Sequence, residues 1–503
     1  MMARYSADLP HAFGEFTHKG QAVMSRATFL LAVFTWVWMA SSAQAQRLDI
    51  YPMPDLSKVE NLTAHDGSRY VVKVNGRAVP VYATNDQHNR MSIQTAYIAY
   101  FSFADMKVDV EVTCGFGVNK AQVRPFSRGI EPAVEGRAIT FTMAEPKKVW
   151  VQANDDLKFP LFIFADAPIE DPGADAVDHY FGPGVHHIGL DYAIQSNQKV
   201  FIAGGAVVEG KFNLPETDRV AFAGRGIICQ GQWTGDRKHQ HRVFESKRAT
   251  RLDVSGIIAI DMDSHCFNWD NGGRRVTNLK IVAFNPTTDG VGSIGYGQTV
   301  EDPDIVKDCF IVTGDDVLRV DGDVDNVLFE DIAIWHDNNC AMIFGQYVTA
   351  GDVTRDITYR DIDVMVSAGK GAVIQTDLQN EGRVENIRFE NIRVEQFDRG
   401  PGLGLVSLTI DKNTLHFHNR WDKEKQGHLS GITIRNLWAP ASPGQLRGHD
   451  EQHKIANVRF IDLVIDGRPI TALDQTDFKT NAFIENVTFE VTSQTEAHHE
   501  PKR

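Results

Sequence analysis

The chain has 503 residues and a formal net charge of −15 at pH 7, and 42% of its residues are hydrophobic. This composition predicts a globular protein, and the length is sufficient for two domains or a solenoid. The sequence contains no basic stripe, which argues against a nucleic-acid partner. None of the five cysteines belongs to a CxxC pair, so their spacing indicates neither a zinc site nor a disulfide framework.

The N-terminal region of the chain predicts an extension followed by a secretory signal. An apolar run from Phe29 to Ala40 is followed by a small-x-small sequence that ends at Ala45, which is the pattern of a signal-peptidase site. The run is too short for a stable transmembrane helix. We therefore expect residues 1–45 to be extension and signal peptide, and the mature protein to be secreted or periplasmic without membrane insertion. The alternative is a buried N-terminal helix.

The next region, residues 47–166, predicts a domain of short strands. Two runs of alternating apolar and polar residues flank Asn75-Gly76, a dipeptide typical of hairpin turns. Similar short runs continue to residue 166 without a long pattern of period 3.6, which indicates an antiparallel β-sandwich. Residues 167–184 are rich in Asp, Pro and Gly and predict a linker.

A sequence repeat organises the C-terminal part of the chain. Its pattern is apolar-x-Asn-apolar-x-apolar-x-x-apolar-x-apolar, and its turn positions Asn326, Asp356 and Asn386 are 30 residues apart. Each unit holds two short period-2 strands and cannot bury its apolar row alone, so successive units must stack. We predict an all-β fold in which the sandwich is followed by a right-handed parallel β-helix over residues 185–493, with a disordered tail at 494–503. Asn and Asp at matching turns are expected to hydrogen-bond along the stack.

Three aspartates stand in two turns of this repeat that contain glycine. Asp289 precedes Gly290, and 26 residues later the doublet Asp315-Asp316 follows Gly314. Because 26 residues is close to one coil, we expect Asp289 to lie in the rung next to the doublet, about 4.8 Å away along the axis. Adjacent acids repel and add nothing to a core. The favoured explanation is glycoside hydrolysis by paired carboxyl groups, which an inverting enzyme holds about 6.5–9.5 Å apart. The alternative is a solvated loop doublet.

The doublet raises a question of geometry. Successive residues of a strand point to opposite faces. Leu318 and Val320 are expected to face the core, which places Asp316 on the inward side. Both acids can face a cleft only when the turn at Gly314 redirects the backbone. Repulsion within the cluster is expected to raise the pKa of one carboxyl group, which then stays protonated as the acid.

The turns and the repeat together resemble a known clan of enzymes. A β-helix with a Thr-Asp-Gly turn and a Gly-Asp-Asp turn is similar to the clan of polygalacturonases (glycoside hydrolase family 28) and dextranase/isopullulanase enzymes (family 49). Residues 334–345 are similar to a Trp- and Asn-containing segment of family 49, which also has an N-terminal sandwich. The resemblance implies that Asp315 is the general acid, that Asp289 and Asp316 position and activate water, and that no cofactor is needed.

The sequence departs from the polygalacturonase pattern at two places. The Gly-His-Gly that follows the doublet in those enzymes is absent at the matching coil, and residues 373–376 (Val-Ile-Gln-Thr) stand where they carry Arg-Ile-Lys. Because the cations that bind a galacturonate carboxylate are missing, this departure favours a neutral glycan such as an α-glucan. Arg319 is an alternative cation for that role. The other expected substrate contacts are Trp335, His336, Gln346, Tyr347 and Gln375.

The sequence therefore predicts a secreted, monomeric, inverting glycoside hydrolase that acts on a polysaccharide, with a dextranase-like preference for a neutral α-glucan and no cofactor or metal site. One alternative is a polygalacturonase-like pectin hydrolase. A second is a lyase of the same fold, which would need Ca²⁺ and a basic residue that abstracts a proton beside a uronate. A third is a non-catalytic β-helical glycan-binding protein.

Overall fold

The structure is a computed structural model of the chain. It describes residues 46–85, 92–230, 242–262, 264–267, 272–296, 301–346, 348–378, 380–410 and 426–492. The predicted signal peptide, the predicted tail and Tyr347 lie outside the described residues. Among the residues that are described, no helix is long and apolar enough to cross a membrane.

The first strands of the described chain form two sheets, one of seven and one of five strands. The seven-stranded sheet follows the order β2 (Leu62–Ala64), β5 (Val81–Asn85), β6 (Thr95–Ala104), β12 (Leu161–Asp166), β11 (Lys148–Ala153) and β8 (Ala121–Arg124), with β1 (Arg47–Ile50) paired to β6. The five-stranded sheet follows the order β4 (Arg77–Val79), β3 (Tyr70–Val74), β7 (Val108–Cys114), β10 (Ala138–Met143) and β9 (Ala133–Glu135). A short 3-10 helix, η1 (Phe126–Arg128), follows β8.

The two sheets pack face to face as the sequence predicted, with one difference in pairing. β3 and β4 form the expected antiparallel hairpin. Its turn residues, Asn75 and Gly76, have φ values of 49° and 74°, as such a turn requires. β6 and β12 run parallel, however, so the seven-stranded sheet is mixed rather than purely antiparallel.

The seven-stranded sheet is buried on both faces. One face shares an apolar core with the five-stranded sheet, and the other packs against the coils that follow in the chain. The rings of Trp150 and Trp335 lie 4.7 Å apart across this second interface. Arg124 forms a buried salt bridge of 2.9 Å with Glu395 beside it. Burial on both faces explains why a strand such as β12 is apolar without alternation.

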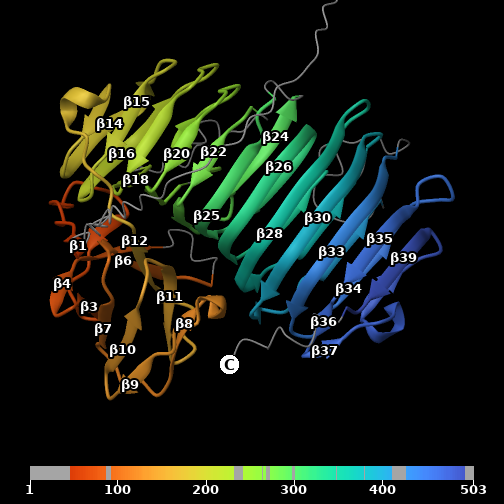
Figure 1. Cartoon of the computed structure of the whole chain (residues 1–503), viewed down its shortest axis with the longest axis horizontal. Coiled ribbons are helices and arrows are strands. Elements are labelled where there is room, and N and C mark those ends of the chain that lie inside the picture. Colours follow the sequence, from red (N-terminus) through yellow and green to blue (C-terminus); the bar gives the residue numbers. More distant parts are fainter. Residues whose placement is uncertain are drawn as a thin grey trace, which may run out of the picture. The chain divides into compact units, whose positions relative to one another are not determined.

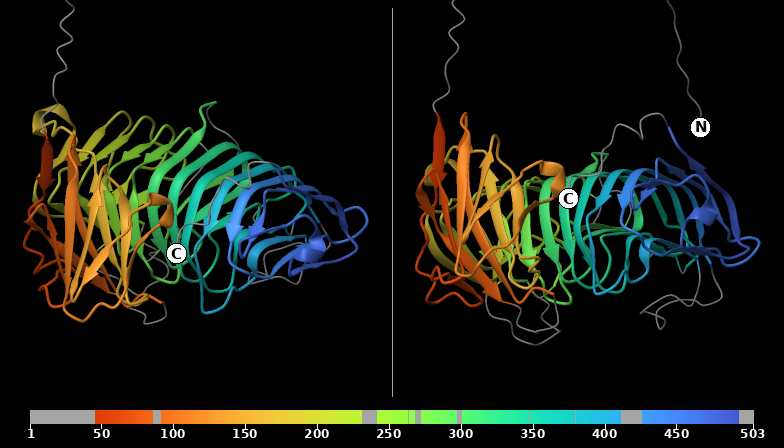
Figure 2. Two further views of the ribbon diagram at one scale, coloured as in Figure 1. Left: turned by 60° about the horizontal axis from the view of Figure 1, so that its bottom comes forward. Right: turned by 90° about the horizontal axis from the view of Figure 1, so that it is seen from below.

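The remaining strands stack as coils whose pairings are parallel, except for a short antiparallel pair of Val464–Ile465 with Arg468–Pro469 (Figures 1 and 2). Their bounds are β13 (His179–Phe181), β14 (Gly184–Ala193), β15 (Lys199–Ile202), β16 (Ala206–Asn213), β17 (Ala221–Gly224), β18 (Ile227–Cys229), β19 (Phe244–Glu245), β20 (Asp253–Ser255), β21 (Ile258–Ile260), β22 (Arg275–Thr277), β23 (Lys280–Ala283), β24 (Val291–Tyr296), β25 (Asp304–Thr313), β26 (Leu318–His336), β27 (Met342–Phe344), β28 (Val353–Ala368), β29 (Ala372–Asp377), β30 (Arg383–Val394), β31 (Phe397–Asp398), β32 (Gly404–Thr409), β33 (His428–Ala439), β34 (Gly444–Arg447), β35 (Ile455–Ile461), β36 (Val464–Ile465), β37 (Arg468–Pro469), β38 (Phe478–Thr480) and β39 (Ile484–Glu490). Two short 3-10 helices, η2 (Ala174–Ala176) and η4 (Leu473–Gln475), lie before β13 and after β37.

These coils confirm the predicted parallel β-helix. β13 already pairs in parallel with β15, so the stacking begins within the segment predicted as a linker. The repeated turn positions Asn326, Asp356 and Asn386 adopt positive φ of 54–58°, a conformation that Asn and Asp tolerate better than other side chains. At the second turn of its coil, the side-chain amide of Asn391 donates a hydrogen bond of 2.8 Å to the carboxylate of Asp361, which lies 30 residues earlier. The predicted Asn and Asp ladder is therefore present.

Replacing Ile387 with Asp is expected to unfold the coils. Ile387 is fully buried and lies between Ile357 and Ile432 of the neighbouring rungs. A carboxylate there would be buried without a partner, which costs on the order of 4 kcal/mol or more. Urea or thermal melts followed by circular dichroism measure this loss. A melt like that of the unchanged protein would contradict the assignment of Ile387 to the core.

Candidate active site

The three aspartates lie where two neighbouring rungs of one sheet begin. Asp289 precedes β24, and the doublet precedes β26. The backbone N–H of Gly290 donates to the carbonyl of Asp316 at 2.8 Å. The N–H of Asp315 donates to the carbonyl of Thr288 at 3.0 Å. These bonds confirm the position of Asp289 that the spacing predicted, in the rung next to the doublet.

The three carboxylates converge on one another. One oxygen from each of Asp289, Asp315 and Asp316 lies within 4.8 Å of the others. This distance joins the nearest oxygens, so the separation of about 6.5–9.5 Å expected between the carboxyl groups of an inverting pair stays a prediction. The backbone bends at Gly314 and Asp315, which supplies the change of direction that the doublet needed. Gly290 permits the close approach, since a Cβ there would lie 2.5 Å from the carbonyl oxygen of Val317.

Two basic side chains, His265 and Arg319, contact the acids. Nδ1 of His265 lies 2.6 Å from Oδ2 of Asp289. Nη1 of Arg319 lies 3.1 Å from the same oxygen and 3.6 Å from Oδ2 of Asp316. Nε of Arg319 lies 2.5 Å from Oδ2 of Asp321. Arg319 was predicted to contact substrate, and the structure places it among the acids instead, with its side chain 13% exposed.

His265 was not predicted from the sequence. It belongs to no motif, and its only signal is its position 24 residues before Asp289, about one coil. The N–H of the next residue, Cys266, donates to the carbonyl of Asp289 at 3.2 Å. This bond places His265 one rung before Asp289, with 28% of its side chain exposed.

The pKa of Asp289 is lowered, whereas the pKa values of Asp315 and Asp316 are raised. Burial raises the pKa of Asp289, but its contacts with His265 and Arg319 outweigh burial and hold that pKa below its usual value. Burial and the charge of Asp289 raise the pKa of Asp315 to about 7. Burial and the charges of both neighbouring acids raise the pKa of Asp316 well above its usual value. At neutral pH the cluster therefore holds an ionised Asp289 beside an Asp315 that is protonated in about half of the molecules and an Asp316 whose raised pKa favours its protonated form.

Two of the predicted substrate contacts are buried, and one of them lies in the interface with the sandwich. Trp335 is fully buried, and its ring packs on Trp150. The prediction that it stacks on a sugar is wrong because neither ring face reaches solvent. His336 is also buried, and its Nε2 lies 2.8 Å from the hydroxyl of Ser367. Burial lowers its pKa to about 3, so we do not retain it as a substrate contact.

Of the remaining predicted contacts, Gln375 lies on β29 and Gln346 lies in the turn after β27. Oε1 of Gln375 accepts a hydrogen bond of 2.9 Å from the N–H of Ala372, and the side chain is buried. Gln346 is 7% exposed, and its N–H donates to Oδ1 of Asp321 at 2.8 Å. Tyr347 lies outside the described residues. The backbone of Gln346 thus contacts Asp321, which pairs with Arg319. The side chain of Gln375 contacts the first residue of its own strand, β29.

The cluster has the donor set of a site for a hard divalent cation, since three carboxylates can supply oxygen ligands. Arg319, however, lies within 3.6 Å of both Asp289 and Asp316. A guanidinium in that position already neutralises the carboxylates and would repel a second cation. The contacts therefore favour acid–base chemistry over metal binding at these residues.

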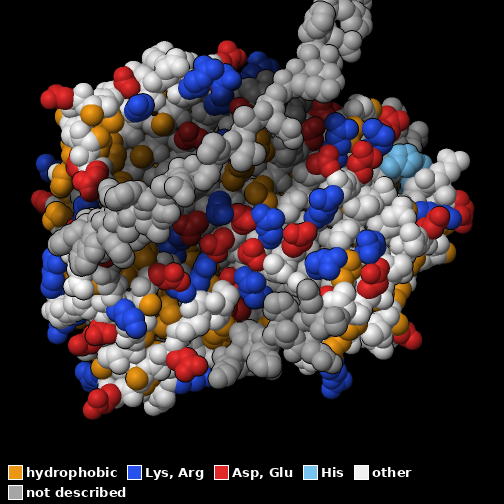
Figure 3. All heavy atoms as spheres, in the orientation of Figure 1, with side chains coloured by type: hydrophobic (Ala, Val, Ile, Leu, Met, Phe, Trp, Pro, Cys, Tyr) orange, Lys and Arg blue, Asp and Glu red, His pale blue; other side chains and the backbone are white. Residues whose placement is uncertain are grey.

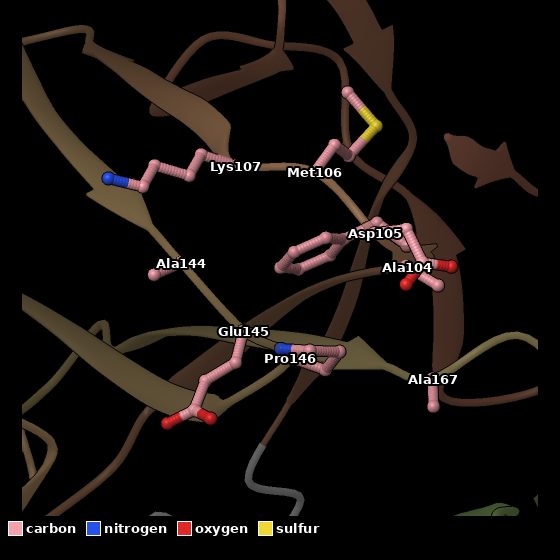
Figure 4. Close-up of a pocket in the computed structure, with 9 residues that line it drawn as sticks. Ala104, Asp105, Met106, Lys107, Ala144, Glu145, Pro146 and Ala167 are labelled. Carbon is pink, nitrogen blue, oxygen red and sulfur yellow. The ribbon is translucent and has the colours of Figure 1, made fainter. Parts of the chain in front are cut away.

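A separate surface cavity lies in the sandwich (Figure 4). Its volume is about 470 Å³, and Lys107 and Glu145 stand on its walls. All of its lining residues belong to the segments 103–107, 144–146 and 167. None of the predicted site residues lines it, so it is distinct from the acid cluster.

Comparisons with known proteins give a limited result. No family model matches the chain, and no curated protein matches its sequence. Among solved structures, the chain is similar to the family 28 exopolygalacturonase of Yersinia enterocolitica, with 9% identity, a TM-score of 0.37, and coverage of 89% of this chain and 96% of that one. It is also similar to a hyperthermoactive exopolygalacturonase from Thermotoga maritima, with 14% identity, a TM-score of 0.33, and coverage of 61% and 84%.

A third similar structure is the catalytic unit of a thermostable GH87 α-1,3-glucanase from Streptomyces thermodiastaticus, with 11% identity, a TM-score of 0.34, and coverage of 90% and 88%. None of these three is a family 49 enzyme, so the predicted closeness to that family stays a prediction. At such low likeness the function has to be argued from the acid cluster itself.

Proposed function

We propose that this protein is an O-glycoside hydrolase acting on a polysaccharide, with Asp315 as the general acid and Asp289 as the general base. The observation that carries the proposal is the opposite shift of two pKa values within one cluster. Asp315 has a pKa of about 7 and Asp289 a pKa below its usual value. Glycoside hydrolysis needs one carboxyl group that holds a proton and one that has lost it.

The reaction follows from these two states. Asp315 gives its proton to the glycosidic oxygen as the bond to the anomeric carbon breaks, and Asp289 takes a proton from the water that attacks that carbon. His265 and Arg319 keep Asp289 ionised through their contacts with Oδ2. Asp316 retains its proton, and in this proposal it positions the attacking water.

The stereochemical outcome depends on whether water or Asp289 attacks the sugar. One oxygen from each carboxylate lies within 4.8 Å of the others, which would allow a retaining pair. Oδ2 of Asp289, however, is held by two donors, His265 and Arg319, and charge-assisted contacts of this kind make an oxygen a poorer nucleophile. We therefore propose inversion. Proton NMR of the first anomer released decides the point, and initial release of the retained anomer would make Asp289 the nucleophile.

The proposed substrate is a neutral glycan such as an α-glucan. Where polygalacturonases carry two cations, this chain has residues 373–376 on β29, and all four are buried. The basic side chains beside the acids, Arg319 and His265, both contact Asp289. A uronate carboxylate would therefore compete with Asp289 for a cationic partner.

Reducing-sugar release from a panel of glycans tests this proposal. The panel contains dextran, pullulan, α-1,3-glucan and polygalacturonate, and each is treated with the mature protein and with Asp315→Asn. Release from a neutral glucan that the variant abolishes is the expected result. Release from polygalacturonate alone would show that another cation binds the uronate, and an unsaturated product with ultraviolet absorbance would identify a lyase. No release from any glycan would count against the hydrolase proposal.

The rate is expected to depend on pH through the same two groups. Activity should fall above about pH 7 as Asp315 loses its proton, and it should fall in acid only below 3.8, the usual pKa of Asp, as Asp289 gains one. Measuring kcat/KM between pH 3 and 9 checks both limits. An activity that rises through pH 7 to 9 would contradict the role of Asp315 as the acid.

A further inference from the structure

Three histidines come together in the C-terminal coils, away from the acid cluster. His428 begins β33, while His449 and His453 lie in the turn between β34 and β35. The ring centroids of His428 and His453 are 5.1 Å apart, and those of His449 and His453 are 6.4 Å apart. Figure 3 shows histidine side chains gathered on this face of the molecule, among acidic and basic side chains over the C-terminal coils.

The fold itself brings these side chains together. Leu429 pairs in parallel with Ile455, so His428 stands next to the residues that precede β35. The turn is closed by a hydrogen bond of 2.9 Å from the N–H of His449 to the carbonyl of His453. Oδ1 of Asp450 also accepts hydrogen bonds of 2.9 Å from the N–H groups of Gln452 and His453. The backbone positions of the three histidines are therefore set by the sheet and the turn, independently of their imidazoles.

One of the two ring pairs has the spacing of imidazoles around one metal ion, and the ligand nitrogens of all three side chains converge within 4.8 Å only after the rings rotate. A Zn–N bond of about 2.0–2.1 Å places the ring centroid about 3.2 Å from the ion, so two rings at a tetrahedral angle have centroids about 5.2 Å apart. The pair His428 and His453, at 5.1 Å, has this spacing. His449 lies 6.4 Å from His453 and needs a side-chain rotation that moves its ring by about 1 Å. Its Nε2 now lies 3.9 Å from Oδ2 of Asp450.

A carboxylate already orients one of the rings. Nδ1 of His453 lies 2.8 Å from Oδ1 of Asp450, which leaves Nε2 as the ring nitrogen available for a ligand. Metal-binding histidines commonly have such a carboxylate on their second nitrogen. The nearest cation, Lys454, is paired with Glu451 at 2.8 Å and Glu485 at 3.6 Å, so its charge is compensated. The histidine side chains remain accessible, with 20% exposure at His453 and 29% at His449.

We propose that His428, His449 and His453 form a binding site for a borderline divalent transition-metal ion such as Zn²⁺, with Asp450 orienting His453. Imidazole nitrogens suit this class of ion better than Ca²⁺ or Mg²⁺, which prefer oxygen ligands. The bound ion joins the start of β33 to the turn before β35. It therefore stabilises the C-terminal coils and takes no part in the chemistry proposed for Asp289 and Asp315.

Calorimetric titration of Zn²⁺ into the metal-free mature protein tests this site. We expect one ion to bind with a Kd in the micromolar range, His453→Ala to weaken binding at least 100-fold, and Asp450→Asn to weaken it 10- to 100-fold. Saturating Zn²⁺ should raise the Tm of the unchanged protein and leave that of His453→Ala unmoved, because only binding to the folded state stabilises it. Neither measurement depends on glycoside hydrolysis.

A matched control addresses two histidines of the C-terminal segment. His498 and His499 lie in the C-terminal segment outside the described residues, and replacing both with Ala should leave the Kd unchanged. Loss of binding in that double variant would assign the ion to the tail and overturn the proposal. Absence of Zn²⁺ binding up to millimolar concentration would overturn it as well, as would an unchanged Kd in His453→Ala.

Discussion

Asp315→Asn is expected to lower the rate of glycoside hydrolysis by about 10³- to 10⁴-fold while the protein stays folded. The amide has the shape of the carboxylic acid but cannot give a proton to the leaving oxygen, and general acid catalysis contributes about this much. The measurement is kcat/KM on the best glycan of the panel. An aryl glycoside with a good leaving group needs less protonation, so the loss on such a substrate should be much smaller.

A matched control for this change is Asp361→Asn. Asp361 lies at a turn of a later coil with a φ of 55°, and it accepts a hydrogen bond from Asn391. Asn tolerates that backbone conformation and still offers a carbonyl oxygen to the ladder. This control should keep the full rate. Equal losses on the glycan and on the aryl glycoside in Asp315→Asn would contradict the assignment of Asp315 as the acid.

Asp315→Asn should also stabilise the fold near neutral pH. The folded pKa of Asp315 is raised from 3.8 to about 7, so between these values the unfolded chain releases a proton that the folded protein keeps. Folding therefore loses stability as pH rises through this window, by at most about 4 kcal/mol. The Asn side chain does not titrate, so the variant does not lose stability in this way. The Tm of the variant should exceed that of the unchanged protein at pH 7 but not at pH 4. A lower Tm at pH 7 would show that the carboxyl group supports the fold.

The architecture could be predicted because it repeats. Asn326, Asp356 and Asn386 recur at a fixed interval, and each occupies a turn with positive φ, where few other side chains are tolerated. The interval of 26 residues between Asp289 and Asp315 is also close to one coil, which predicts that Asp289 lies in the rung next to the doublet. At the repeated turn positions the backbone conformation that Asn and Asp tolerate is also the one that the stacked coils require. The repeat can therefore be recognised in a single sequence.

The details of the site depended on contacts that no repeat encodes. Trp335 looked like a sugar-binding side chain because it lies close to the acids in sequence, but the sandwich covers it with Trp150. The spacing of the sequence did not show that Arg319 contacts the carboxylates of Asp289 and Asp321. His265 had no pattern at all. Each of these depends on the meeting of segments that are distant in the chain, and side-chain packing decides it.

Asp289→Asn is expected to lower the rate by about 10²- to 10⁴-fold on every substrate, including the aryl glycoside. Its amide cannot take a proton from water, and a better leaving group does not replace that step. Comparing kcat/KM for the two substrate classes separates this variant from Asp315→Asn. Similar selectivity for the aryl glycoside in both variants would contradict the separate roles of acid and base.

Asp289→Asn should also change stability in the opposite direction to Asp315→Asn. The folded pKa of Asp289 lies below 3.8 because His265 and Arg319 contact it. A depressed carboxyl pKa stabilises the fold above the unfolded value, and this stability is lost as pH falls through the folded value. At pH 7 the variant loses the contribution and leaves His265 without its carboxylate, so its Tm should fall. A Tm equal to or above that of the unchanged protein would mean that the ion pair contributes nothing to the fold.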